Sequence, residues 1–363
     1  MSRIGRLLSG CCVALALCPP AAAGSGSASG DWAHAPYELG QGLQYPEQDL
    51  NLGGYLSVRY WDVEQLPNSL SVKDLSLFIS KGFGARWSVF SELEIGDAIT
   101  VSSDRVDTSD AEFELERLYA DYRASQGLSL RLGKFLTPVG RWNLIHADPL
   151  VWTVSRPLTT AVGFARQATG AMFYGALPLG RNSLDYSLFL DSTKELDTGQ
   201  QEETAYEHFN PTLTVNGAFD RAVGGRLVYH LFDGRFDLGL SLLQYRMHDL
   251  REDKHLVGAD LFWRTSMLEL SGEAIYRGSS GDTESDEKGG FLQAVVPLPG
   301  HFNAIGRYER YDAAIETSTT TVQVLGLTYR PRPPLSFKLE YRDGKYNERI
   351  APSGWLGSVA VLF

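Results

Sequence analysis

Apolar and polar side chains alternate strictly in LSFKLEYR, residues 335–342. Because successive side chains of a β-strand point to opposite faces, one face here is apolar and the other carries Lys338, Glu340 and Arg342. The segments 184–191 and 268–277 repeat this alternation. Charges are costly in lipid, so we expect the polar face to line water and the apolar face to meet lipid. A soluble β-sandwich would instead need a second sheet over each apolar face.

The composition agrees with a transmembrane β-barrel, in which lipid-facing and lumen-facing residues alternate. The chain of 363 residues has 37 Gly, 17 Phe, 17 Tyr and 7 Trp. After residue 23, no apolar run reaches the roughly 18 residues that a membrane helix needs. We predict an all-β protein, a transmembrane antiparallel β-barrel of about sixteen strands. The predicted strands are 51–60, 71–81, 84–95, 112–124, 127–136, 167–177, 181–191, 221–231, 234–247, 253–264, 267–277, 286–297, 300–311, 318–330, 335–343 and 354–363, with 208–219 as an alternative to 221–231.

The connections between these strands alternate in length. One set is short, as at 82–83, 125–126 and 232–233, and the other is longer, as at 61–70, 96–111, 137–166 and 192–220. Short periplasmic turns and long extracellular loops are typical of bacterial outer-membrane barrels.

The first 23 residues predict an export signal. Arg3 and Arg6 precede an apolar run, and Ala21 and Ala23 offer small residues for cleavage before Gly24. All three cysteines lie within this signal, so the mature chain has no disulfide or thiolate site. A lipoprotein cleavage at Cys11 is the alternative, but little apolar sequence precedes it. We expect residues 24–50 to be a periplasmic segment and 51–363 to be the barrel.

The last strand ends on an aromatic residue. Trp355, Val359, Val361 and Phe363 share one face. This arrangement resembles the C-terminal assembly signal that the barrel-insertion machinery of Gram-negative bacteria recognises. The resemblance implies export to the outer membrane.

A barrel of sixteen strands leaves an aqueous channel unless something fills it. The 137–166 connection is long enough to narrow that channel and is rich in Trp and Pro. We therefore expect a porin for small hydrophilic solutes or ions. The candidate constriction residues are Lys134, Arg141, Trp142, His146, Asp148, Arg156 and Arg166. The candidate acidic wall across the lumen is Glu92, Glu94, Glu114, Glu116, Glu269 and Glu273.

The stretch Leu130 to Gly140, LRLGKFLTPVG, is similar to a strand-end motif of the phosphate-selective O/P-type porins. No counterpart of that family's arginine ladder or lysine-rich loop is found. The resemblance implies a channel, and it does not extend to phosphate selectivity. Sixteen-strand porins are often homotrimers, an assembly that the sequence leaves open.

Charge is distributed unevenly. Removal of the signal takes the formal charge from −11 to −13, and most of the excess lies in 96–111, 192–220 and 278–287. These acids indicate a solvated outer surface, or one where divalent cations bridge them to lipopolysaccharide phosphates. We expect no metal site of the protein's own, no cofactor and no nucleic-acid partner.

Two other functions stay open from the sequence. An outer-membrane enzyme would need a paired base, for which His146 with Asp148 and His248 with Asp249 are the close pairs. A sheath or exporter component would hold a partner protein in its lumen, and low single-channel conductance would favour it over a porin.

Overall fold

The computed structural model describes most of the chain after the predicted signal. The described residues are 37–363 without 65, 104, 110, 146, 162–163, 193–218, 248–252, 281–285, 313–318 and 347–350. The predicted signal 1–23, His146 and the pair His248–Asp249 therefore lie outside them.

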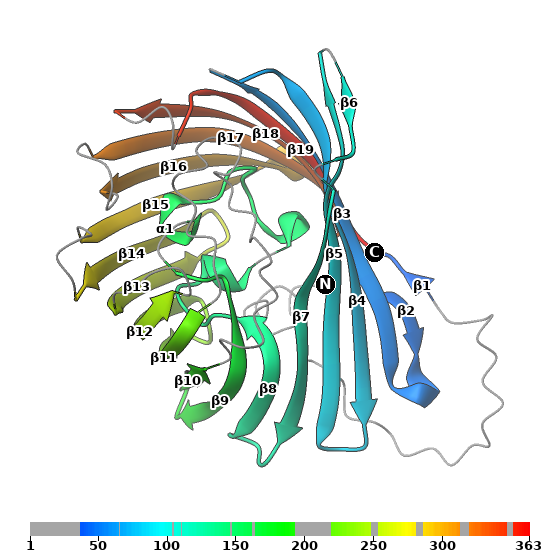
Figure 1. Ribbon diagram of the computed structural model, residues 1–363, viewed down its shortest axis with the longest axis vertical. Helices are drawn as coiled ribbons and strands as arrows, with labels where there is room; N and C mark the ends of the chain where they lie inside the picture. Colours follow the sequence, from blue (N-terminus) through cyan, green and yellow to red (C-terminus); the bar gives the residue numbers. More distant parts are fainter. Residues whose placement is uncertain are drawn as a thin grey trace.

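The prediction of a sixteen-strand antiparallel barrel is confirmed: sixteen long strands pair with their chain neighbours, and the last pairs with the first (Figure 1). Closure joins Val359 to Val58 and Leu362 to Tyr55. The strands are β3 (Leu50–Val63), β4 (Ser69–Phe83), β5 (Trp87–Ser102), β7 (Glu112–Arg123), β8 (Ser129–Leu136), β9 (Gln167–Leu179), β10 (Asn182–Asp191), β11 (Phe219–Leu231), β12 (Phe236–Met247), β13 (Lys254–Arg264), β14 (Glu269–Ser279), β15 (Glu287–Leu298), β16 (Phe302–Asp312), β17 (Thr320–Arg332), β18 (Leu335–Lys345) and β19 (Gly354–Leu362).

Short elements complete the fold. They are β1 (Tyr37–Glu38), β2 (Gly42–Tyr45), β6 (Val106–Asp107), α1 (Leu158–Ala161) and the 3-10 turns η3 (Pro46–Gln48), η4 (Trp142–Leu144), η5 (Asp148–Leu150) and η8 (Pro299–His301). β2 pairs with the start of β3, Leu43 opposite Leu52, just beyond the point where β19 ends. Within the described part of the chain, no helix is long and apolar enough to cross a membrane.

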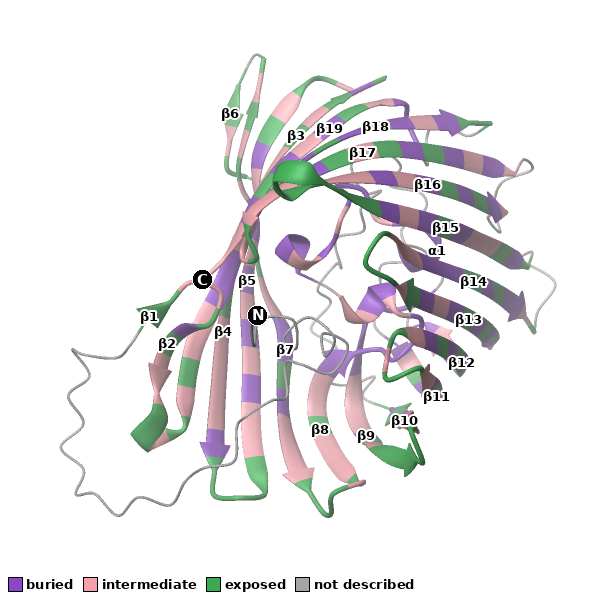
Figure 2. Cartoon of the chain, turned by 180° about the vertical axis from the view of Figure 1, so that it is seen from behind, coloured by how far each residue is buried: buried purple, intermediate pink, exposed green. Residues whose placement is uncertain are grey.

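Burial is inverted relative to a soluble protein. On β18, Phe337, Leu339 and Tyr341 are exposed, whereas Lys338 and Glu340 are 5% and 1% exposed. Figure 2 shows this alternation of exposed and buried residues along the strands. An exterior of exposed apolar side chains needs a non-aqueous surrounding, so the outer face is built to meet lipid.

The predicted loop 96–111 is wrong at its start, because β5 continues to Ser102 and β6 pairs back on it. Ile99 and Val101 continue the outward apolar row. A register shift between Val72 and Asp74 interrupts the alternation opposite Gly96, and this interruption hides the continuation of the strand in the sequence.

A second irregularity lies between β5 and β7. The pairing moves from Glu92 opposite Arg117 to Leu93 opposite Leu115, which leaves Glu116 as the extra residue. Glu116 and Arg117 are consecutive and yet both buried, at 2% and 6% exposure. The bulge therefore adds one more charged side chain to the inner face than strict alternation provides.

Candidate functional site

The connection 137–166 folds into the barrel interior rather than outward (Figure 1). Trp142 and Val151 pack against Phe291 of β15, and Val154 packs with Val63 of β3 and Leu356 of β19. These apolar contacts remove bulky side chains from the aqueous lumen and fix the path of the segment. We call residues 137–166 the inner loop.

Wall carboxylates accept hydrogen bonds from the inner loop's backbone. Glu273, Glu309 and Glu340 supply the acceptors, on β14, β16 and β18. Their donors are the N–H groups of Arg141 (2.7 Å) and Trp142 (2.6 Å) for Glu273, Val154 (2.8 Å) and Ser155 (2.9 Å) for Glu340, and Leu158 (2.7 Å) for Glu309. Buried carboxylates are costly unless hydrogen-bonded, so these bonds stabilise both the acids and the loop.

Wall cations bind the loop's carbonyl groups in turn. Lys338 donates to the carbonyl of Asp148 at 2.6 Å, and Arg330 donates to that of Val151 at 2.8 Å. Arg307 donates to the carbonyl of Ser155 at 2.9 Å. The wall therefore binds the backbone of one segment with charged groups of both signs.

Gly140 lets the loop approach the wall. Its φ is +63°, and a Cβ there would lie 2.5 Å from a carboxylate oxygen of Glu273. Its N–H donates to Ser241 Oγ at 3.1 Å. A side chain at residue 140 would displace the acceptor of the next two N–H groups, so glycine is required both by conformation and by space.

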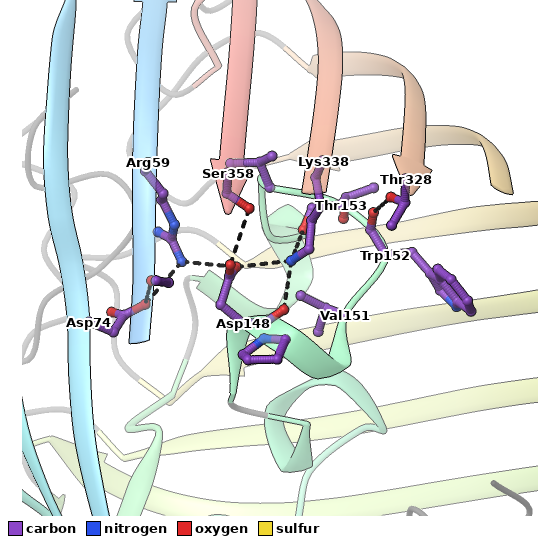
Figure 3. Close-up of polar contacts among 12 residues, drawn as sticks. Arg59, Asp74, Asp148, Val151, Trp152, Thr153, Thr328, Lys338 and Ser358 are labelled. Carbon is purple, nitrogen blue, oxygen red and sulfur yellow. Dashed lines mark hydrogen bonds and ion pairs between the residues drawn. The ribbon is translucent and has the colours of Figure 1, made fainter. Parts of the chain in front are cut away.

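The side chain of Asp148 forms ion pairs with two strands of the wall (Figure 3). Its carboxylate lies 3.2 Å from Lys338 Nζ and 3.4 Å from Arg59, and it accepts a hydrogen bond from Ser358 at 3.2 Å. Burial opposes its charged form, but Lys338 and Arg59 outweigh burial and hold the pKa of Asp148 below its ordinary value. Asp148 is therefore a carboxylate at neutral pH.

Arg156 lies near two other cations. Burial, together with the neighbouring Arg166 and Arg59, lowers the pKa of Arg156 to about 10, against the attraction of Asp74. Arg156 therefore keeps its charge at neutral pH. Arg59 is 3.6 Å from Asp74. Three arginines thus gather at the end of the inner loop, beside an acid of β4.

The four candidate acids of β5 and β7, Glu92, Glu94, Glu114 and Glu116, lie on the inner face. Glu94 and Glu114 are directly opposite each other across the strand pair. Glu92 pairs with Arg117, and Glu116 accepts from Gln167. Arg166 interacts electrostatically with Glu92 and Glu114. These acids and the arginine cluster therefore meet on the β4–β5–β7 side of the lumen.

The remaining candidates are placed differently. Lys134 is in register with Leu118 and Thr169 on the outer face, so the prediction that it borders the lumen is wrong. Its place follows from the alternation of β8, which continues to Leu136. Arg141 stacks over Phe262 at 3.8 Å and lies 3.7 Å from Asp237. Glu269 pairs with Arg264 and accepts from Trp152 Nε1 at 2.7 Å, so it anchors the loop as Glu273 does.

Several residues of this site were missing from the predicted set. They are Arg59, Arg307, Glu309, Arg330, Lys338 and Glu340. Strand alternation places Lys338 and Glu340 on the water-facing side, and that signal could have selected them. Nothing in the sequence indicates that they bind the loop's backbone.

The C-terminal residues close the barrel. Trp355 and Val359 are exposed on the outer face. Phe363 donates its N–H to the carbonyl of Gly54 and accepts from Gly54 N–H, both at 2.8 Å. No cluster of three or more His, Cys, Asp or Glu suited to a metal ion occurs among the residues that the structure describes.

Comparison with known proteins gives the following matches. No protein-family model matches the chain. An uncharacterized protein of Aquifex aeolicus is 22% identical, over 87% of this chain and 80% of that protein. The anion-selective porin of Comamonas acidovorans is 16% identical with a TM-score of 0.56, over 86% of this chain and 98% of that one. OmpF of Salmonella typhi is 10% identical with a TM-score of 0.58, over 88% and 99%. The outer membrane channel DcaP of Acinetobacter baumannii is 13% identical with a TM-score of 0.53, over 86% and 97%. At these identities the structural likeness establishes the fold.

Proposed function

We propose that the chain is an outer-membrane porin, a water-filled channel for passive diffusion of small hydrophilic solutes or ions. The observation that carries this proposal is the inner loop, bound by its backbone to both acidic and basic wall residues inside a sixteen-strand barrel. A barrel of this size needs an internal segment to narrow its lumen, and a rigid segment sets a reproducible pore. The porins and channels among its structural neighbours support the same function.

The constriction is proposed to lie between the inner loop and the β4–β5–β7 wall. Many wall charges elsewhere bind the loop's backbone, so they are not available to solutes. Arg59, Arg156 and Arg166 oppose Glu92, Glu94, Glu114 and Glu116 in this region. Opposed charges across a narrow, low-dielectric passage orient polar solutes and set ion preference.

The cellular setting is part of the proposal. Export by a cleaved signal at residues 1–23, insertion by the barrel-assembly machinery and a homotrimer in the outer membrane fit a porin. The motif at 130–140 supports a relationship with the O/P-type porins, without their phosphate preference. Acidic connections such as 192–220 are proposed to face outward, where divalent cations bridge carboxylates to lipopolysaccharide.

We do not favour an enzyme. Among the residues that the structure describes, His230 is paired with two acids: its Nδ1 is 2.7 Å from Asp237 and its Nε2 is 3.1 Å from Asp185. Because carboxylates occupy both nitrogens, neither is placed to take a proton from a nucleophile. A sheath for a partner protein is also disfavoured, because the inner loop occupies the space that a partner would need.

Planar-bilayer recording with a salt gradient tests this function. We expect single-channel steps in the purified barrel. We expect Arg156→Gln to shift the reversal potential toward cation preference and Glu114→Gln toward anion preference. Arg181→Gln is the matched control, because that side chain is 88% exposed in the turn after β9 and should shift nothing. Absence of channel steps would instead favour the sheath. Equal shifts of the reversal potential in all three variants would contradict the proposed location of the constriction.

A further inference from the structure

A cavity of about 500 Å³ lies on the wall formed by β14, β15 and β16, the strands against which α1 of the inner loop lies. Its lining includes Ala274, Lys288, Gly290, Arg310 and Asp312. These five residues fall in two adjacent cross-strand rows, Ala274–Gly290–Arg310 and Lys288–Asp312. Ala274, Lys288 and Arg310 are exposed, so the hollow opens on the outer face. We call it the rim cavity.

The shape of the rim cavity follows from its residues. Ala274 and Gly290 form the floor and place almost no side chain above the sheet. Large exposed tyrosines flank it, Tyr276 beside Lys288 and Tyr308 one row below Arg310. Tyrosine with its polar tip and apolar ring is typical of the boundary between hydrocarbon and lipid headgroups. The rim cavity therefore lies at that boundary.

The position along the strands agrees. Lys288 is the second residue of β15, and Arg310 is the third from the end of β16. Both lie at the rim carrying the connections 280–286 and 313–319. Below them the outward residues are apolar, among them Leu292 and Val296, and the space above Gly306 is open. A polar hollow thus continues into an apolar surface with room for a hydrocarbon chain.

Two cations of the rim cavity, Lys288 and Arg310, lie beside two acids, Asp312 and Asp286, and the guanidinium of Arg310 is the group that suits an anionic headgroup. Arg310 belongs to the strand of Arg307, but Arg307 points inward and pairs with Glu309, whereas Arg310 points outward. Asp312 lies 3.8 Å from Lys288, and Asp286 accepts from the hydroxyl of Tyr276 at 2.6 Å. A guanidinium at a lipid boundary is stabilised when it binds phosphate, which it contacts through two parallel N–H donors.

We propose that the rim cavity binds the phosphate group of a membrane lipid. Arg310 contacts the phosphate together with Lys288, the floor of Ala274 and Gly290 admits the headgroup, and an acyl chain lies over Leu292 and Gly306. This site is separate from the channel and from any bridging of acidic loops by divalent cations, because its contacts come from cations of the strands themselves.

The test uses the full barrel in a phosphate-free detergent, titrated with diphosphoryl lipid A in the presence of a chelator and followed by native mass spectrometry. We expect the double variant Lys288→Gln/Arg310→Gln to bind at least about ten-fold more weakly, the effect of losing charge-assisted hydrogen bonds. Ala274→Leu fills the floor without changing charge and should also weaken binding. Lys345→Gln is the matched control, because Lys345 lies at the same rim on β18 and pairs with Asp343 at 3.4 Å, outside the cavity.

Four outcomes would overturn the proposal. The first is unchanged binding in the double variant, and the second is equal binding of dephosphorylated lipid A. The third is competition by inorganic phosphate at concentrations equal to the lipid, which would make the cavity a site for the free anion. The fourth is dissociation of an oligomer by Ala274→Leu with lipid binding intact, which would make it a subunit contact. None of these measurements depends on conductance, so failure here leaves the channel function untouched.

Discussion

At the scale of single residues, Asp148 explains how the inner loop is held against the barrel wall. It is 3% exposed, and its carboxylate is shared by Lys338 and Arg59 from two different strands. Its own backbone carbonyl also accepts from Lys338. One residue thus ties the inner loop to both β3 and β18, the strands on either side of the closing strand β19.

The pKa of Asp148 gives a prediction with a definite sign. A carboxyl group whose pKa is lowered by folding contributes stability above its unfolded pKa, near 3.9, and this contribution is lost as the pH falls through the lower, folded value. Asp148→Asn should therefore destabilise the barrel at neutral pH, by about 3–5 kcal/mol for a broken buried pair. The difference between wild type and variant should shrink as the pH falls below about 5, because protonation of Asp148 removes both ion pairs.

Heat-modified gel migration at several pH values measures this difference as a shift in Tm. Ser358→Ala is the control, since it removes one hydrogen bond to the same carboxylate, worth about 1 kcal/mol, and keeps both ion pairs. A difference in Tm that is the same at pH 7 and pH 3 would contradict the assignment of charge to Asp148.

At the scale of elements, the inner loop is a backbone held by side chains of the wall. Deleting residues 142–152 removes η4 and η5 and leaves the contacts of Glu340 and Glu309 with residues 154–158. We expect single-channel conductance to rise, because the deleted residues no longer occupy the barrel interior while the barrel stays closed through β19 and β3.

Single-channel recording in high salt measures the change. The matched control is a deletion of eleven residues from the acidic connection 193–218, which should alter conductance mainly at low salt, where charges at the mouth are less screened. Unchanged conductance after deletion of residues 142–152 would place the constriction elsewhere and would contradict the proposed role of the inner loop.

Sequence patterns predict these elements unevenly. The alternation in β18 and β14 correctly assigns Glu340 and Glu273 to the inner face, because the side-chain period of a strand is two. The bulges at Glu116 and opposite Lys73 add residues outside that period, and no local signal marks them. The prediction for Lys134 is wrong because its parity with Leu132, and not its charge, decides on which face it lies. The binding of the loop's backbone depends on tertiary contacts across more than a hundred residues, which periodicity cannot predict.

At the scale of the whole molecule, closure of the barrel depends on the two chain ends meeting. β19 pairs with β3 up to Tyr55, Phe363 exchanges two backbone hydrogen bonds with Gly54, and β2 continues the pairing from Leu52 to Leu50. β19, Phe363 and β2 therefore pair one after another along the same edge of the chain segment 50–63. The last residue of the chain fills the junction between β19 and β2, so its loss leaves a gap in the backbone pairing of the wall.

The final prediction separates two roles of Phe363. Deleting it removes two backbone hydrogen bonds, each worth about 0.5–1.5 kcal/mol, which a barrel with sixteen paired strands should tolerate when refolded in detergent. If the terminal aromatic is also the assembly signal, deletion should lower insertion in cells far more than refolding in detergent, with export to the periplasm intact. Phe363→Tyr, which keeps both an aromatic ring and the backbone bonds, should behave as wild type in both assays. The two quantities to compare are the folded fraction in isolated outer membranes and the refolding yield in detergent. An equal loss of folded fraction and refolding yield would mean that Phe363 acts through barrel closure alone. Normal values of both quantities would mean that Phe363 has no role in assembly.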